Sequence, residues 1–311
     1  MKSAIVTGSN GFVGNAVVRE LMEQGVNVVA IIHNDNRTRL MDIDGLEIIS
    51  CNNSDVSNLL DFIDYGSCDV FYHFAWAGSA GNLRSDYTVQ IENAKNLLDA
   101  MVVSKKLGCS KFVAAGTIME SEVYGAVHLD GNKPSPSYIY GAGKLSAHLM
   151  ASALATQLDI DLIWAKITNT YGPGESSPRL VNTTIKKCMA GMSPEFTSGI
   201  QNYDFIYIDD LAHAFYLLGM YGKSHSSYIM GSSNAKPLKE FLLEMKDSIA
   251  PELDFKFGDV PFSGVNLPLS AFDTSTLEKD TGFRASVSFG EGCLRTKKWL
   301  ESLGGTDGTK F

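Results

Sequence analysis

Tyr140 and Lys144 are the two residues of this 311-residue chain whose types and spacing point most directly to chemistry. On a helix, residues i and i+4 share a face, so the Lys144 ammonium can approach the Tyr140 phenol. The unperturbed pKa of a phenol is about 10, and a nearby positive charge lowers it. A phenol whose pKa is lowered toward neutral can exchange the proton that accompanies hydride transfer. The pair therefore predicts acid–base catalysis in a redox reaction.

A glycine loop near the amino terminus, Thr7-Gly8-Ser9-Asn10-Gly11-Phe12-Val13-Gly14, precedes this pair. The loop follows a short apolar strand pattern and opens an amphipathic helical pattern. In that context Gly8 and Gly11 allow a tight turn beside a pyrophosphate, Gly14 lets the helix pack closely on the strand, and the helix amino terminus attracts the anion. We therefore predict a dinucleotide site with cofactor contacts from Gly8, Asn10, Gly11, Phe12, Val13 and Gly14.

Further cofactor contacts are expected where the third and fourth strand candidates end. Asp55 and Val56 offer a carboxylate and a backbone amide to an adenine edge, although a helix cap is an equally good interpretation of Asp55. His73 ends the fourth strand and is interpreted as a strand-end histidine rather than a catalyst. The cofactor candidates in these segments, together with the catalytic pair, are Asp55, Val56, Phe74, Ala75, Trp76, Tyr140 and Lys144.

The end of the second strand candidate bears on the choice of dinucleotide. It reads Ile32-His33-Asn34, whereas sites that prefer a ribose 2′-hydroxyl carry an acid there. Without that carboxylate, His33 together with Arg37 or Arg39 can receive a 2′-phosphate, and Asp35 keeps the other choice open. We expect NAD(P) as the cofactor, with NADP favoured over NAD.

Composition excludes several classes of function. The net charge of −9 opposes nonspecific attraction to nucleic acid or to anionic membranes. The five cysteines are scattered and odd in number, which is typical of reduced thiols in the cytoplasm. The six histidines form no metal-binding motif, and no apolar run reaches the length of a membrane span. We expect a cytoplasmic protein with no metal site and no nucleic-acid or membrane partner.

The elements that must position these residues alternate between short apolar runs and longer helical patterns. This order predicts an α/β fold, a doubly wound parallel (Rossmann) sheet with sites at the carboxyl ends of its strands. The strand candidates are 4–6, 26–32, 46–51, 69–74, 111–115 and 161–167, and the helical patterns include 12–24, 87–106 and 140–158. A further strand and helix, 205–208 and 209–221, are expected to return to the sheet.

Proline becomes frequent after Tyr171-Gly172-Pro173, which predicts a smaller carboxyl-terminal substrate-binding region. The expected boundaries are 1–172 for the dinucleotide-binding domain with 204–230 returning to it, 173–203 and 231–303 for the substrate-binding region, and 304–311 for a frayed tail.

Five motifs, distributed over nearly the whole chain, follow one another in a fixed order. They are T-G-S-N-G-F-V-G, H-F-A, Tyr140-x-x-x-Lys144, N-T-Y-G-P from Asn169, and D-F-I-Y-I-D-D from Asp204. With them the chain resembles the extended short-chain dehydrogenase/reductase family, in particular its NAD-dependent epimerase/dehydratase group of sugar-nucleotide enzymes. The resemblance implies a catalytic triad of Thr117, Tyr140 and Lys144 and a nucleotide-linked sugar as substrate. Ser121 is the alternative hydroxyl if the segment is shifted by one turn.

The same resemblance bears on the reaction. Dehydratases of the group follow the catalytic threonine with an Asp-Glu pair, whereas this chain has Ile118-Met119. An apolar pair cannot carry the protons of an elimination, so 4,6-dehydration is disfavoured, and 4-keto reduction or C4 epimerisation is expected. The substrate contacts expected on this basis are Trp76, Thr117, Asn169, Arg179 and Tyr203.

Two other functions and one assembly remain open from the sequence. Tyr203 stands where many relatives carry a phosphate-binding arginine, which keeps a smaller ketone or aldehyde substrate, as in dihydroflavonol-reductase-like enzymes, as an alternative. A noncatalytic dinucleotide sensor is the least expected function, because such relatives lack the tyrosine–lysine pair. A homodimer through the segments 87–106 and 140–158 is possible.

Overall fold

A parallel sheet forms the larger of two lobes in the computed structural model, which describes residues 1–33, 39–66, 68–127, 135–136, 138–262 and 264–304. All neighbouring strands of this sheet run parallel, as the predicted α/β, doubly wound Rossmann fold requires. That prediction is confirmed. Within the described residues the sheet has seven strands, in the spatial order β11 (Ser226–Met230), β6 (Asp161–Ile167), β5 (Lys111–Thr117), β4 (Val70–His73), β1 (Ser3–Thr7), β2 (Asn27–Ile32) and β3 (Glu47–Ser50).

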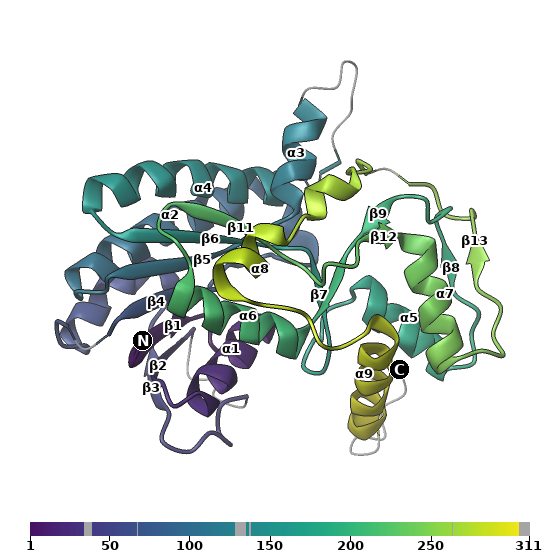
Figure 1. The fold of residues 1–311 in the computed structure, drawn as a ribbon, viewed down its shortest axis with the longest axis horizontal. Coiled ribbons are helices and arrows are strands. Elements are labelled where there is room, and N and C mark those ends of the chain that lie inside the picture. Colours follow the sequence, from purple (N-terminus) through teal and green to yellow (C-terminus); the bar gives the residue numbers. More distant parts are fainter. Residues whose placement is uncertain (34–38, 67, 128–134, 137, 263, 305–311) are drawn as a thin grey trace.

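Helices cover both faces of the sheet (Figure 1). Successive residues of a strand point to opposite faces, so Ala4 and Val6 of β1 pack on one side and Ile5 on the other. The first side carries α1 (Phe12–Glu23) and α6 (Ile208–Tyr221), and the second carries the 3-10 helix η1 (Asn53–Asp61), α2 (Tyr87–Lys106) and α4 (Tyr138–Leu158). None of the helices in the described part of the chain has both the length and the apolar composition to cross a bilayer.

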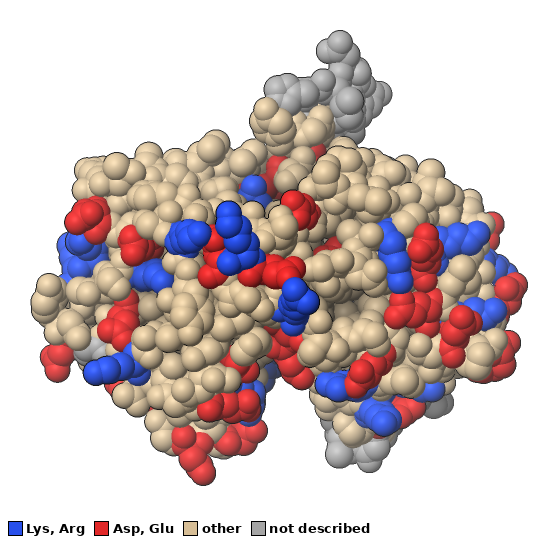
Figure 2. Space-filling model, viewed as in Figure 1, with Lys and Arg blue, Asp and Glu red and all other residues tan. Residues whose placement is uncertain are grey.

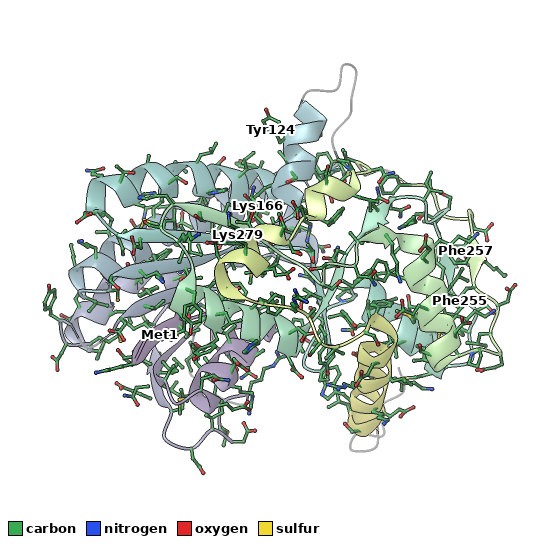
Figure 3. All side chains as sticks on the ribbon, in the orientation of Figure 1. Met1, Tyr124, Lys166, Phe255, Phe257 and Lys279 are labelled. Atoms are coloured by element: carbon green, nitrogen blue, oxygen red, sulfur yellow. The ribbon has the colours of Figure 1, made fainter. Side chains whose placement is uncertain are left out.

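The smaller lobe lies at the carboxyl ends of the sheet strands and contributes an aromatic cluster to the core. The Phe255 and Phe257 rings, labelled in Figure 3, lie 5.4 Å and 5.5 Å from the Phe196 ring. Its elements and the carboxyl-terminal helices are α5 (Leu180–Met189), β8 (Glu195–Phe196), β9 (Asn202–Tyr203), β12 (Lys236–Pro237), α7 (Leu238–Ile249), β13 (Lys256–Phe257), η3 (Leu269–Phe272), α8 (Ser275–Thr281) and α9 (Phe289–Gly304).

The strand predicted at 205–208 does form, but it does not return to the main sheet. β10 (Phe205–Tyr207) pairs in parallel with β7 (Asn169–Tyr171) in a separate two-stranded sheet, and β11 is the strand that joins β6. A strand pattern shows that a segment is extended and apolar but does not name its partner, which explains the error. The carboxyl-terminal residues 305–311 of the predicted tail lie outside the described residues.

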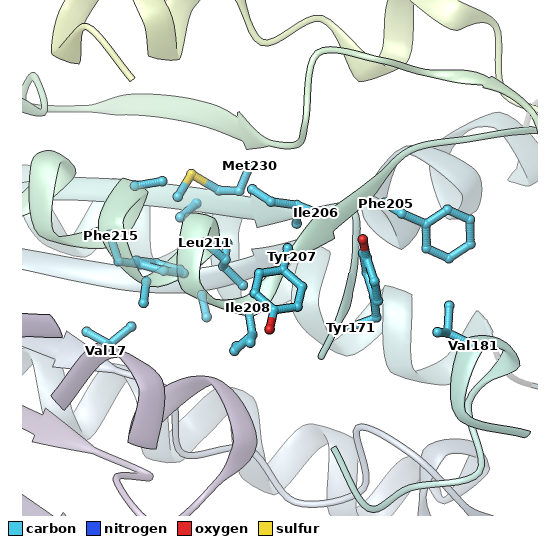
Figure 4. Close-up of a cluster of buried hydrophobic side chains, with 14 of the residues drawn as sticks. Val17, Tyr171, Val181, Phe205, Ile206, Tyr207, Ile208, Leu211, Phe215 and Met230 are labelled. Carbon is cyan, nitrogen blue, oxygen red and sulfur yellow. The ribbon is translucent and has the colours of Figure 1, made fainter. Parts of the chain in front are cut away.

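The two lobes share one hydrophobic core. Figure 4 shows Val17 of α1, Phe215 of α6 and Met230 of β11 on the sheet side of a cluster that continues through Tyr171 to Val181 of α5. On the surface, Figure 2 shows positive and negative side chains interspersed on the face in view. The continuous core fixes the position of the smaller lobe against the strand ends.

Candidate active site

The loop between β1 and α1 has a backbone that leaves no room for side chains at two of its glycines. Gly8 has a φ of +70°, and a Cβ built there would lie 2.7 Å from the amide nitrogen of Ala75. A Cβ on Gly14 would lie 2.2 Å from the carbonyl oxygen of Gly8. The Gly11 amide donates a hydrogen bond to that same oxygen at 2.9 Å. The loop is therefore a tight cradle of backbone at the amino terminus of α1.

A groove of about 510 Å³ runs along this loop, and we call it the glycine-loop groove. The side-chain oxygen Oδ1 of Asn10, which lines it, is buried and has no hydrogen-bond partner within the described structure. A ligand in the groove can satisfy that atom, so the residues fit a bound dinucleotide. The predicted cofactor residues that line the groove are Gly8, Asn10, Gly11, Phe12, Val13, Gly14, Phe74, Trp76, Tyr140 and Lys144.

Several predicted cofactor residues are not part of this lining. The Val56 side chain is 3% exposed within the hydrophobic core under α2, and Asp55 and His33 are exposed. Ala75 approaches Gly8 through its backbone. Arg37, one of the two arginines expected to receive a 2′-phosphate, lies outside the described residues. The other, Arg39, lines the groove.

Thr117 and Tyr140 meet at the end of β5. Their side chains share a hydrogen bond, and both residues are buried. The Thr117 amide donates to Oε1 of the buried Glu120 at 2.8 Å, which fixes the chain as it leaves the strand. Ser121, the alternative hydroxyl, does not line either of the two cavities at this site. The structure thus brings Thr117, and not Ser121, to the phenol.

Lys144 lies one turn after Tyr140 on α4 and is fully enclosed. Its Nζ donates a hydrogen bond to the Ala115 carbonyl oxygen at 2.7 Å and lies 3.7 Å from the centre of the Trp76 ring. Trp76 is in turn held by a 2.7 Å hydrogen bond from its Nε1 to Gln90. Burial lowers the pKa of Lys144 to about 7, against the opposing effect of Glu120. Near neutral pH this ammonium is therefore readily deprotonated.

The electrostatics of Tyr140 differ from the sequence-based expectation. Burial raises the pKa of the phenol, and the charges that oppose this rise are first Arg84 and then Arg179. The hydrogen bond from Thr117 also lowers the pKa. In the protein by itself, desolvation of the enclosed phenol outweighs the neighbouring cations, and the lowering expected from Lys144 together with an oxidised nicotinamide ring stays a prediction for the cofactor complex.

A second cavity of about 440 Å³ opens on the other side of Tyr140, toward the smaller lobe, and we call it the Tyr203 cavity. The predicted substrate residues that line it are Thr117, Asn169, Arg179 and Tyr203, whereas Trp76 lines only the glycine-loop groove. Asn169 also braces β10, because its Nδ2 donates to the Asp204 carbonyl oxygen at 3.0 Å. Thr117, Tyr140 and Arg179 line both cavities, so the two cavities meet at the phenol.

Three charged residues of the Tyr203 cavity were not predicted, and one of them, the buried Glu175, follows β7. Arg84 lies in the 3-10 helix η2 (Asn82–Ser85), and Glu122 lies in α3 (Met119–Val127). Burial raises the pKa of Glu122 to about 7, against the opposing charge of Arg84. No sequence motif marks Arg84, and Glu122 lies directly after Ser121, the alternative hydroxyl, without a signal of its own. Tyr124, on the same helix, is 64% exposed and points away from the body of the molecule (Figure 3).

Comparisons with known proteins identify the class. The model of the NAD dependent epimerase/dehydratase family matches residues 4–231, and the chain belongs to that family. A curated relative, dTDP-glucose 4,6-dehydratase from Escherichia coli, is 24% identical over 337 residues and is matched over 95% of this chain and 91% of its own length.

Solved structures share the fold over nearly the full length. UDP-N-acetylglucosamine 4-epimerase from Methanobrevibacter ruminantium M1, in complex with UDP-N-acetylmuramic acid, has a TM-score of 0.81 at 22% identity, with 97% of this chain and 99% of that chain covered. dTDP-glucose 4,6-dehydratase from Bacillus anthracis, in complex with NAD, has a TM-score of 0.76 at 18% identity, with 98% of each chain covered.

The expectation that disfavoured 4,6-dehydration is wrong, because the curated relatives that match 95% of this chain are dTDP-glucose 4,6-dehydratases. Ile118 and Met119 occupy only the two positions directly after Thr117, and the cavity also receives side chains from farther along the chain. α3 carries the chain along the Tyr203 cavity, and its Glu122 faces that cavity with a pKa near neutral. Acid–base groups for the sugar can thus come from a position three residues further on.

Proposed function

We propose that this protein oxidises C4 of a nucleotide-linked sugar by hydride transfer to a nicotinamide dinucleotide, with Tyr140 as the base. The observation that supports it is the position of Tyr140, which lines both the glycine-loop groove and the Tyr203 cavity. A cofactor in the groove and a sugar in the cavity would meet at that phenol. The names of the relatives agree on the carbon, because 4-epimerase and 4,6-dehydratase both specify position 4.

In this mechanism each residue has a definite task. The Thr117 hydroxyl binds the C4 hydroxyl oxygen, and the Tyr140 oxygen removes its proton. The bound dinucleotide supplies the hydride acceptor. Lys144 and Trp76 form the wall of the groove beside Tyr140, where the ammonium favours the phenolate when protonated. The main contribution of the site is to hold C4 of the sugar close to the cofactor and correctly oriented, since alignment alone can lower the activation barrier by several kcal/mol.

Product analysis tests this function. The purified protein is incubated with NAD⁺ or NADP⁺ and either dTDP-glucose or UDP-N-acetylglucosamine, and the products are identified by mass spectrometry and NMR. Loss of one water identifies a dehydratase, and an unchanged mass with inverted C4 identifies an epimerase. In a parallel incubation with NADPH or NADH, equal turnover of a small ketone or aldehyde that carries no nucleotide would contradict the proposed substrate. Dinucleotide binding without turnover of any of these compounds would favour the alternative function, a noncatalytic dinucleotide sensor.

The assignment of the catalytic hydroxyl gives a direct comparison of two variants. Thr117→Ala is expected to lower turnover about 10- to 100-fold, because the C4 oxygen loses a positioned hydrogen bond in the transition state. Ser121→Ala should stay within about 2-fold of wild type, because Ser121 lines neither cavity. Steady-state kinetics of both variants show which hydroxyl is catalytic. A larger loss in Ser121→Ala than in Thr117→Ala would assign the catalytic hydroxyl to Ser121.

The proposed preference for NADP rests on the absence of an acid at the end of β2 and on Arg39, which lines the glycine-loop groove. The relative from Bacillus anthracis was solved with NAD, so the choice needs a direct measurement. Arg39→Ala should weaken NADP⁺ binding about 10-fold and leave NAD⁺ binding nearly unchanged, since a single phosphate contact is lost. Titration calorimetry gives both dissociation constants. Equal losses for the two cofactors, or tighter NAD⁺ binding by wild type, would contradict the preference.

The proposal also includes a homodimer through α2 and α4. These helices expose apolar side chains, among them Tyr87, Ile91 and Leu149, which are 68%, 65% and 65% exposed. Apolar surface of this kind on packed helices is typical of a subunit interface. Light scattering coupled to size-exclusion chromatography measures the mass, and a monomer at micromolar concentration would remove this part of the proposal.

A further inference from the structure

Arg84 is a half-buried cation that the proposed mechanism does not use, although it is in contact with the catalytic phenol. Its guanidinium carbon Cζ lies 4.4 Å from the centre of the Tyr140 ring. Two contacts hold it there: Nη1 donates to the Ser79 carbonyl oxygen at 2.7 Å, and Nη2 donates to the Met119 sulfur at 3.0 Å. Arg84 is therefore fixed on the ring rather than free in the cavity.

Charged groups reach Tyr140 from each element packed around it. Arg84 comes from η2, Arg179 from the residue before α5 and Glu120 from α3, whereas Lys144, one turn further along α4, is held by the Ala115 carbonyl oxygen and the Trp76 ring. Glu122 of α3 and Tyr203 of β9 act on Arg84 in turn. Of the cations, Arg179 is offset by Glu175, whose Oε2 lies 3.3 Å from its Nε. Arg84 is thus the cation that lies directly on the phenol ring.

The permanence of its charge distinguishes Arg84 from Lys144. Burial lowers the pKa of Lys144 to about 7, so that its ammonium is partly deprotonated near neutral pH. A guanidinium remains charged throughout the working range. When the phenol loses its proton, the negative charge spreads into the aromatic ring, and a cation over the ring face attracts the phenolate more strongly than the phenol.

We propose that Arg84 is a positioning residue that stabilises the phenolate form of Tyr140 and thereby sets the pH above which C4 oxidation reaches its full rate. The inference rests on the proposed role of Tyr140 as the base. It also gives a role to Met119, one of the two apolar residues after Thr117, because its sulfur accepts one of the hydrogen bonds that hold Arg84.

The sign of the expected pH effect follows from the reaction. A base must be deprotonated to act, so the rate of C4 oxidation rises with pH up to the pKa of the phenol. In Arg84→Gln the rising part of the pH–rate profile, which we call its acid limb, should move to a pH about 1 unit higher. This is the effect expected when one nearby opposite charge is lost. At neutral pH the rate should therefore fall about 10-fold, and it should recover in alkaline buffer. Arg84→Lys keeps the charge and should restore most of the wild-type profile.

The experiment compares kcat over a pH series for wild type, Arg84→Gln, Arg84→Lys and Met119→Leu, with Arg284→Gln as the control. Arg284 has an 80% exposed side chain paired with Glu278, so that variant should follow wild type. Met119→Leu should give a smaller shift in the same direction, which keeps the proposal testable if Arg84→Gln does not fold. An unchanged limb with only a raised KM, or an equal shift in Arg84→Lys, would overturn the proposal.

A second measurement separates this inference from the proposed function. The ultraviolet absorption of phenolate is titrated in the NAD⁺ complex without any sugar, and the spectrum of the corresponding Tyr140→Phe protein is subtracted. The midpoint for Tyr140 should rise by about 1 pH unit in Arg84→Gln. That result supports the inference even if C4 oxidation is the wrong reaction, and an unchanged midpoint would reject it even if C4 oxidation is right.

Discussion

Replacement of Tyr140 by phenylalanine is expected to cut turnover by about 10²-fold or more, which is the usual scale for loss of a general acid or base. Dinucleotide affinity should remain close to that of wild type, because the ring that lines the glycine-loop groove and carries Arg84 on its face is retained. The separation of the two effects is the informative feature, since it assigns the phenol to proton transfer and not to binding.

The measurement combines steady-state kinetics with a binding titration of the dinucleotide. Tyr124→Phe provides a matched control, because Tyr124 is 64% exposed on α3 and points away from the molecule (Figure 3). It should retain wild-type turnover. A Tyr140→Phe protein with near-normal rates would show that another group moves the proton, and Glu122 would then be the first described residue to examine.

The second large effect is expected from Gly14→Ala. The added Cβ would lie 2.2 Å from the Gly8 carbonyl oxygen, and neither atom can turn away, because the backbone fixes the position of a Cβ and the oxygen belongs to the backbone. Overpacking of this kind costs about 1 to 3 kcal/mol. Because the glycine loop must shift to relieve it, we expect dinucleotide affinity to fall about 10- to 100-fold, which corresponds to that cost.

Titration calorimetry measures the loss, and thermal unfolding followed by circular dichroism shows whether the fold survives. Gly125→Ala is the matched control, since a Cβ at Gly125 meets only a Val265 methyl group at an ordinary 3.7 Å. Wild-type dinucleotide affinity in Gly14→Ala would mean that the loop does not cradle the cofactor.

The parts of the fold that depend on local sequence were predicted well. The alternation of apolar runs and helical patterns predicted six strands of the sheet, and β6 has the predicted bounds, 161–167. The glycine loop could also be predicted from the sequence, because a tight turn beside another backbone segment requires glycine at defined positions such as Gly8 and Gly14. Tyr140 and Lys144 could be placed together because helical spacing alone puts them on one face.

What could not be predicted depends on which distant segments meet. The pairing of β10 with β7 joins residues more than thirty positions apart, and the pattern of Phe205–Tyr207 contains no information on its partner. Arg84 reaches Tyr140 from a short turn of 3-10 helix that has no sequence motif. Dehydration was wrongly disfavoured for the same reason: Ile118 and Met119 are the neighbours of Thr117 in sequence, whereas the cavity also receives Glu122 from the next turn of the chain.

The most direct test of the central claim follows the hydrogen atom on C4 itself. The protein with bound NAD⁺ is given dTDP-glucose or UDP-N-acetylglucosamine carrying deuterium at C4, the reaction is quenched within one turnover, and the cofactor is analysed by mass spectrometry. We predict that deuterium appears on the reduced nicotinamide in wild type and that its transfer is at least about 10²-fold slower in Tyr140→Phe. Because epimerisation and dehydration both return the hydride to the sugar, product that forms with no transient label on the nicotinamide and at the same rate from labelled and unlabelled sugar would contradict hydride transfer from C4 and with it the function proposed for this site.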